Sequence, residues 1–442
     1  MSRIHTDLLL LTIAIGLTGC GAIPILMGRI RLKGEQDAIP TPRPTADMAA
    51  GMHDWPCWRG TAGDGRSTVT GIRTNWAGGL KQLWQVDFLC QDRKTGATWS
   101  APVIRGERLI AIGRSTDSDL IFCLSAITGE LIWTNSYAAG KAGSHGSGAR
   151  ATPCIDGDRV FSLGRYGDLV CYQLADGKLL WRTTLTAHGG EAPRWGHASS
   201  PLVVGDNVIV QLGGTAFAAA FNKQTGTLAW KSAPGDAGYA APTVTIGESP
   251  SILVFHATGI SCLEPAAGRT RWTVPWVTKY GVNATTPLVL DSRVYITSGY
   301  STGGEMLDIS GTEPVVAWRN ETIAAQHSDP YIVDGCLYGF AGSSHQNKGP
   351  LACVNADTGA TRWSTSELGW GTMVYVDGYL LTLNIEGDLF LLKPDPAKPN
   401  IVATMPGAME ASGVPTWTTP VIANGKLYLR HLQHLKCYDL MP

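Results

Sequence analysis

Thr128-Gly129-Glu130-Leu131-Ile132-Trp133 is the stretch that decides the fold of this 442-residue chain. The same phrase, a glycine turn followed four residues later by tryptophan, returns at residues 176–181, 225–230 and 358–363, and in degenerate form at 267–272. Copies spaced by roughly 40 to 50 residues indicate a repeat architecture. The sequence therefore predicts one small structural unit used many times.

A second landmark precedes each copy of the phrase. It is a short apolar run that ends at Gly or Asp and begins after a proline, namely Pro102, Pro153, Pro201, Pro242, Pro287, Pro330 and Pro420. Met373 opens the same slot without a proline, which makes eight slots. Between one slot and its tryptophan lie runs of Val, Ile, Leu and aromatic residues bounded by Gly and Asp, a pattern typical of four short antiparallel strands.

Eight such units predict an all-β fold, an eight-bladed β-propeller of four-stranded antiparallel blades, because a single small sheet cannot bury both of its faces. Bulky side chains are expected to fill the gaps between blades: Trp84, Trp133, Trp181, Trp230, Trp272, Trp318 and Trp363. The eighth unit has no tryptophan strand of its own. We therefore expect residues 83–86 to complete it and close the ring.

The N-terminus has the features of a bacterial lipoprotein signal. Residues 1–19 hold an apolar stretch behind Arg3, and Leu17-Thr18-Gly19-Cys20 matches a lipobox, which predicts cleavage and lipidation at Cys20. The alternative is an uncleaved transmembrane anchor over residues 8–27. With Arg29, Arg31 and Lys33 behind it, such an anchor would keep the next segment cytoplasmic. We expect a flexible tether at 20–52, a leader at 53–82 that packs on the propeller, and the propeller at 83–442.

Charge and cysteine content narrow the choices further. The net charge of −1 comes without a basic stripe, which excludes nucleic acid as an expected partner. Buried free thiols are expected where cysteines recur in the third strand of different repeats, at Cys123, Cys171, Cys262, Cys353 and Cys437. The pairing of Cys57, Cys90, Cys154 and Cys336 stays open, as does the oligomeric state.

Residues 355–363, Asn-Ala-Asp-Thr-Gly-Ala-Thr-Arg-Trp, resemble the PQQ-like propeller repeat of quinoprotein dehydrogenases. The leader at 54–60 resembles the Asp-Trp-Pro-x-Trp-Arg-Gly opening of exported bacterial members. A lipobox with eight blades is also similar to the propeller lipoprotein of the outer-membrane β-barrel assembly machinery. The resemblance implies an outer-membrane protein that faces the periplasm, and a scaffold for protein partners in outer-membrane protein assembly.

The same resemblance implies an alternative function, that of a PQQ-dependent alcohol or sugar dehydrogenase. Quinoprotein alcohol dehydrogenases hold the quinone beneath a pair of adjacent cysteines, with a calcium ion and an aspartate base. This sequence has no adjacent cysteine pair and no motif for that calcium site. We therefore expect binding rather than catalysis and no bound cofactor, with the quinone as the alternative.

Candidate binding residues lie in the segments that precede the slots, since these segments converge on one face of a propeller. They are His145, Arg150, Arg194, Trp195, His197, Lys279, Tyr280, Asn283, His327, Asp329, Trp370 and Trp417, with Tyr239 among them. Together they predict a pocket for an anionic or planar ligand. The alternative is that they cap the channel and satisfy backbone groups. A lone histidine per loop predicts no metal site.

Overall fold

The computed structural model describes residues 51, 53–91, 98–140, 146–246, 250–342, 349–411 and 414–442. The chain divides after Gln36 into two units, and all of these residues belong to the second, Asp37–Pro442. The predicted signal peptide, Cys20, most of the tether and the candidate His145 lie outside the described residues. No helix in the described ranges is both long and apolar enough to cross a bilayer.

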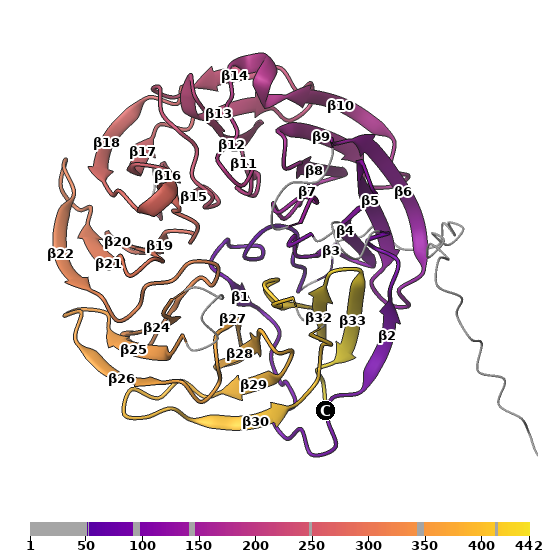
Figure 1. The fold of residues 1–442 in the computed structure, drawn as a ribbon, viewed down its shortest axis with the longest axis vertical. Helices are drawn as coiled ribbons and strands as arrows, with labels where there is room; N and C mark the ends of the chain where they lie inside the picture. Colours follow the sequence, from indigo (N-terminus) through magenta and orange to yellow (C-terminus); the bar gives the residue numbers. More distant parts are fainter. Residues whose placement is uncertain are drawn as a thin grey trace, which may run out of the picture. The chain divides into compact units, whose positions relative to one another are not determined.

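Eight sheets follow one another around a ring (Figure 1). Blade 1 contains β3 (Val103–Arg105), β4 (Arg108–Arg114), β5 (Ser118–Ser125) and β6 (Leu131–Ala138), and blade 2 contains β7 (Cys154–Asp156), β8 (Arg159–Leu163), β9 (Asp168–Gln173) and β10 (Leu179–Thr184). Blade 3 contains β11 (Leu202–Val204), β12 (Asn207–Gly213), β13 (Ala216–Asn222) and β14 (Leu228–Lys231). Blade 4 contains β15 (Thr243–Val244), β16 (Ile252–His256), β17 (Gly259–Leu263) and β18 (Thr270–Pro275).

Blades 5 to 8 continue the ring in the same order. Blade 5 contains β19 (Leu288–Leu290), β20 (Arg293–Ser298), β21 (Gly303–Asp308) and β22 (Val315–Asn320), and blade 6 contains β23 (Tyr331–Val333), β24 (Cys336–Phe340), β25 (Leu351–Asn355) and β26 (Thr361–Thr365). Blade 7 contains β27 (Gly371–Val376), β28 (Tyr379–Asn384), β29 (Leu389–Leu392) and β30 (Ile401–Met405). Blade 8 contains β31 (Val421–Ala423), β32 (Lys426–His431) and β33 (His434–Asp439), together with β2 (Gln82–Val86). The helices of the described ranges are two short 3₁₀ turns, η1 (Leu185–His188) and η2 (Lys279–Gly281).

The predicted closure of the ring is confirmed. Strand β2 pairs antiparallel with β33, so the N-terminal strand completes the C-terminal blade, with Trp84 opposite Cys437. The eight-bladed fold is confirmed with it. Blade 7 carries one strand more than predicted, because β1 (Arg66–Ser67) of the leader adds to β27 in parallel. Its outer strand β30 forms without a tryptophan.

The recurring phrase joins neighbouring blades. The indole N–H of Trp133 donates to the carbonyl of Leu174 in blade 2 at 2.9 Å, and that of Trp181 donates to Lys223 in blade 3 at 3.0 Å. In both cases the tryptophan therefore covers the turn of the neighbouring blade. Side chains of facing sheets fill the space between, as Phe161 and Leu163 of blade 2 do against Val208 of blade 3.

The five repeat cysteines occupy the third strand of their blades, as predicted. They are Cys123 in β5, Cys171 in β9, Cys262 in β17, Cys353 in β25 and Cys437 in β33, and all five are buried free thiols. Phe221 holds the same slot in β13 and is also buried. Because a thiol and a phenyl ring share this inward position, its role is apolar packing.

Candidate functional site

The leader runs through the centre of the ring, where Figure 1 shows the β1 segment inside the circle of blades. Asp54 accepts hydrogen bonds from Gly106 of blade 1 and Asn424 of blade 8, both at 2.9 Å. Trp55 forms a β-bridge with Ile104 of blade 1. Ser67 donates to the carbonyl of Ile422 in blade 8 at 3.1 Å, next to the β1–β27 pairing with blade 7. The leader therefore lines the inner strands of the ring.

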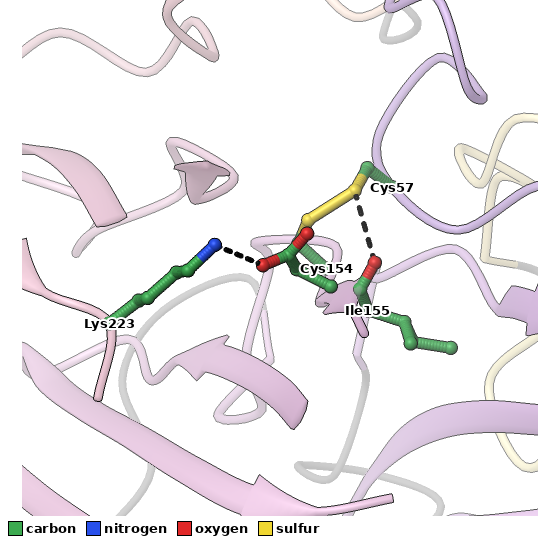
Figure 2. The surroundings of a disulfide bond; sticks show 5 residues. Cys57, Cys154, Ile155 and Lys223 are labelled. Carbon is green, nitrogen blue, oxygen red and sulfur yellow. Dashed lines mark hydrogen bonds and ion pairs between the residues drawn. A yellow bond between two sulfur atoms is a disulfide. The ribbon is translucent and has the colours of Figure 1, made fainter. Parts of the chain in front are cut away.

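A disulfide fastens the leader to blade 2. Cys57 and Cys154 are bonded across 97 residues of sequence, and Figure 2 shows the bond between the leader and the start of β7. The amide of Ile155 donates to the carbonyl of Pro56 at 2.7 Å beside it. Asp156, at the end of the same strand, forms an ion pair with the Lys223 ammonium of blade 3 at 2.8 Å. The disulfide thereby settles the pairing of two cysteines that the sequence left open, and Cys90 and Cys336 are free and buried.

The next two leader residues reach blades 5 and 6. The indole N–H of Trp58 donates to the Thr286 hydroxyl at 2.8 Å. Arg59 Nη1 lies 2.8 Å from Asp329 Oδ2, and the other carboxylate oxygen accepts the amide of Thr286 at 2.9 Å. Both charged side chains are buried. Burial is the largest single effect and would lower the pKa of Arg59, but the charge and hydrogen bond of Asp329, together with Tyr331 and Asp64, raise the pKa on balance.

A pocket of about 170 Å³ opens above these contacts. One repeat position supplies seven of the sixteen lining residues. It is the residue three places before a slot: Trp99, Arg150, Ala198, Tyr239, Ala284, His327 and Trp417. Trp58 of the leader contributes as well. We call this the central pocket. Six of the predicted candidates line it, which are Arg150, Trp195, Tyr239, His327, Asp329 and Trp417.

The central pocket is lined by aromatic rings from opposite sides of the propeller. The Trp99 and Trp417 rings, from blades 1 and 8, have centroids 4.6 Å apart, and His327 of blade 6 lies 5.1 Å from Trp417. Across the ring, Trp195 and Tyr239 of blades 3 and 4 are 6.0 Å apart. The pocket therefore presents flat apolar surfaces that a planar group can contact.

Among the described residues that line the central pocket, the charge is positive on balance. The Arg150 guanidinium supplies the positive charge. Burial and the nearby charge of Arg165 lower the pKa of Arg150 to about 10, so this side chain stays protonated at neutral pH. The lining carboxylate, Asp329, is neutralised by Arg59. Gln326 also lines the pocket, is buried, and has an amide oxygen without a hydrogen-bond partner in the described residues.

Three other candidates lie at the edge of the pocket. The Arg194 guanidinium lies over the rings of Trp195 and Tyr280, at 5.3 and 4.9 Å from their centroids. The Lys279 ammonium lies 5.2 Å from the Tyr280 centroid, and Tyr280 packs edge-on to Tyr300 at 6.0 Å. We call Arg194, Trp195, Lys279, Tyr280 and Tyr300 the aromatic rim. Arg194, Lys279 and Tyr280 are exposed.

The remaining candidates are buried among structural contacts. Asn283 joins blades 4 and 5, since its amide donates to His256 at 2.7 Å and accepts from Ser298 at 2.8 Å. His197 packs in the interior, and burial lowers its pKa to about 4. Trp370 stands three residues before the slot of blade 7. It is fully buried against His327, with ring centroids 6.4 Å apart. These three do not line the central pocket.

A quinone with calcium would need several oxygen ligands and space for fused rings. Calcium takes six to eight oxygen ligands, often from several carboxylates. The pocket offers one carboxylate, already paired with Arg59, and no group of three His, Cys, Asp or Glu residues gathers anywhere in the described ranges. The pocket volume of about 170 Å³ is also near that of a single ring, given that a cavity of about 150 Å³ holds benzene. The side chains of the central pocket therefore do not fit a quinone with calcium.

Sequence reasoning missed Trp58, Trp99, Tyr300 and Gln326 as lining residues. Trp99 had a signal, because it stands three residues before Pro102, as Trp417 stands before Pro420. Trp58 had none, since its place in the pocket depends on the path of the leader. Tyr300 comes from the β20–β21 turn rather than from a segment before a slot.

Comparison with known proteins gives the chain relatives. The family model described as outer membrane protein assembly factor BamB (PQQ_2) matches residues 121–345, just over half of the chain. Outer membrane protein assembly factor BamB of Yersinia pestis is 24% identical over 354 residues, which cover 74% of this chain and 81% of that protein.

Two solved structures share the fold. BamB from Moraxella catarrhalis superposes with a TM-score of 0.58 at 16% identity, over 81% of this chain and 97% of that one. Quinohemoprotein alcohol dehydrogenase from Comamonas testosteroni gives 0.62 at 13% identity, over 89% and 82%. At these identities the likeness shows the propeller alone. The family match is more specific, and it shows that the chain belongs to the PQQ-repeat β-propeller family described as outer membrane protein assembly factor BamB.

Proposed function

We propose that this protein is a cell-envelope scaffold that binds a protein partner in outer-membrane protein assembly, and that the aromatic rim is the contact surface. The family match supports the assembly role. The observation that carries the binding surface is the stack of Arg194 over Trp195 and Tyr280 at the exposed edge of the central pocket. Tryptophan, tyrosine and arginine dominate the binding energy of protein interfaces.

The geometry of the rim suits a preformed contact surface. Tyr280 is half exposed and has a backbone φ of 63°, which holds its ring out from η2. Arg194 and Lys279 pack against that ring, and Trp195 lies edge-on to it at 5.7 Å. Rings that already contact one another lose little conformational freedom when a partner binds. The two cations favour a partner surface with acidic groups.

A capture experiment tests the scaffold function. Full-length protein with Tyr280→Ala or Arg194→Ala is used to capture partners from envelope extract beside the wild type. We expect either change to lower recovery of the same partner by tenfold or more, because truncation at a hot spot costs about 2 kcal/mol. Arg362→Ala, on the exposed face of β26, is the matched control and should capture normally. Equal recovery by all four proteins would remove the rim from the interface.

We also propose that Cys20 is lipidated and anchors the propeller to the outer membrane, facing the periplasm. The lipobox before Cys20 supports this. Cells grown with a fatty-acid analogue should label the wild type and leave Cys20→Ala unlabelled. Equal labelling of the two proteins would favour the uncleaved transmembrane anchor instead.

The alternative function is a PQQ-dependent dehydrogenase, which the shared propeller fold suggests. The size and single paired carboxylate of the central pocket speak against it. Titration of the purified chain with the quinone and calcium separates the two proposals. Saturable binding with dye-linked oxidation of an alcohol or sugar would replace the scaffold proposal with the enzyme.

A further inference from the structure

We propose that the central pocket binds one aromatic ring that carries a carboxylate, either as a small free acid or as the C-terminal aromatic residue of a polypeptide. This site is separate from the aromatic rim contact with a folded partner and goes beyond the scaffold function. The two ideas also fail separately, because the ligand is tested on purified protein with no partner present.

Pocket size selects a single ring. The volume is about 170 Å³, and a cavity of about 150 Å³ accommodates benzene. Pockets for drug-sized ligands begin at about 300 Å³. One ring with a short carboxylate arm therefore matches the space, whereas a fused three-ring molecule exceeds it.

The walls favour a planar occupant. Trp99 and Trp417 come from blades 1 and 8, while Trp195 and Tyr239 come from blades 3 and 4 on the other side of the ring (Figure 1). Trp58 of the leader also lines the pocket, and its position is held by the disulfide at Cys57 and by its hydrogen bond to Thr286. A ligand ring entering between these indoles gains stacking or edge contacts worth about 0.5–1.5 kcal/mol per pair beyond burial.

The charges select an anion. An aromatic cage alone suits a quaternary ammonium ion as well. Here, however, Arg150 faces the same space, and a second guanidinium, Arg165, is close enough to help lower its pKa. The lining carboxylate Asp329 is already neutralised by Arg59. Among the described lining residues, an ammonium ion would therefore meet a positive balance of charge, whereas a carboxylate would meet the Arg150 guanidinium.

The Gln326 amide is a second polar group in the pocket. Gln326 is buried, lines the pocket, and has an amide oxygen without a hydrogen-bond partner in the described ranges. A buried amide oxygen left without a partner is costly, and a ligand N–H that donates to it relieves that cost. Gln326 therefore suits the backbone N–H of a C-terminal aromatic residue, while the ligand carboxylate pairs with Arg150.

Titration calorimetry on the full-length protein tests the proposal with phenylacetate and its neutral analogue phenylacetamide. We expect the acid to bind at least tenfold more tightly, the value of one charge-assisted hydrogen bond. Arg150→Gln should remove most of this preference and leave amide binding nearly unchanged. Arg362→Gln, exposed on β26, should keep it. Melting curves report whether each variant folds.

Two further ligands identify the source of the carboxylate. A hexapeptide that ends in phenylalanine is compared with the same peptide amidated at its C-terminus. Tighter binding of the free-acid peptide than of phenylacetate indicates a polypeptide end, while binding of phenylacetate alone indicates a small free acid. Two results with the wild-type protein overturn the proposal, even if Arg150→Gln fails to fold. One is equal affinity for phenylacetate and phenylacetamide, and the other is no binding of these two compounds or of either hexapeptide.

Discussion

The indole of Trp84 lies directly against Gly129, so the tryptophan of the last blade rests on the glycine turn of the first. A β-carbon on Gly129 would come within 2.7 Å of the ring, and the glycine has a φ of 76°. The same contact recurs between Trp181 and Gly226. The recurring phrase is thus two halves of one contact made between neighbouring blades, and at Trp84 that contact closes the ring.

Trp84→Ala should lower the free energy of unfolding by about 3–5 kcal/mol, because it leaves a cavity at the closing blade. Gly129→Ala should cost at least about 1–2 kcal/mol from the left-handed backbone alone. Urea unfolding measures both. Ile127→Ala, exposed in the same turn, is the control and should change stability by less than about 0.5 kcal/mol. A Trp84→Ala protein as stable as the wild type would contradict closure through this strand.

Arg59→Met should destabilise the fold by about 3–5 kcal/mol, since it leaves the Asp329 charge buried without its partner. Adding Asp329→Asn should recover part of that loss, because the amide can still accept the hydrogen bond from Thr286. A double-mutant cycle in urea measures the coupling. Strictly additive effects would show that the two charges do not interact.

Cys57→Ser with Cys154→Ser should lower stability by about 2–5 kcal/mol, because the disulfide closes a loop of 97 residues. Wild-type protein treated with a reductant should match the double variant. Cys336→Ser changes a buried free thiol and leaves the disulfide in place, so this control should lose as much stability on reduction as the wild type does. Reductant that leaves the wild-type unfolding curve unchanged would indicate that the bond is absent in solution.

Stability should fall with acid because His197 is buried and neutral. Its pKa is lowered to about 4, whereas the unfolded histidine titrates near 6.5, so the unfolded state takes up a proton first as the pH falls. The stabilisation is therefore complete above about pH 6.5 and is lost toward pH 4. Between pH 7 and 5 this side chain should account for about 2 kcal/mol.

His197→Gln checks that contribution. The variant's stability should depend less on pH between 7 and 5 than that of the wild type, whatever its absolute stability. His256 and His431 have equally lowered pKa values from burial and give the wild type a further acid sensitivity that His197→Gln retains. Parallel pH profiles for the two proteins would mean that His197 titrates normally in the fold.

The candidate site was predictable where it follows the repeat. Arg150, His327 and Trp417 stand three residues before their slots, and the ring carries that position to the central pocket in blade after blade. Trp370 holds the same position in blade 7 but is fully buried, packed against His327 and Phe340. Asn283 and His197 have site-like chemistry but make structural contacts.

The sequence by itself determined the number of blades, the borrowed strand and the inward position of the cysteines. These features depend on local patterns that recur with a fixed period, so neighbouring copies explain one another. Only the tertiary structure decided the path of the leader, the Cys57–Cys154 bond and the floor of the central pocket. Arg59 and Asp329 are 270 residues apart, and no period links them. Their contact exists only because the closed ring brings the inner ends of all blades to one axis.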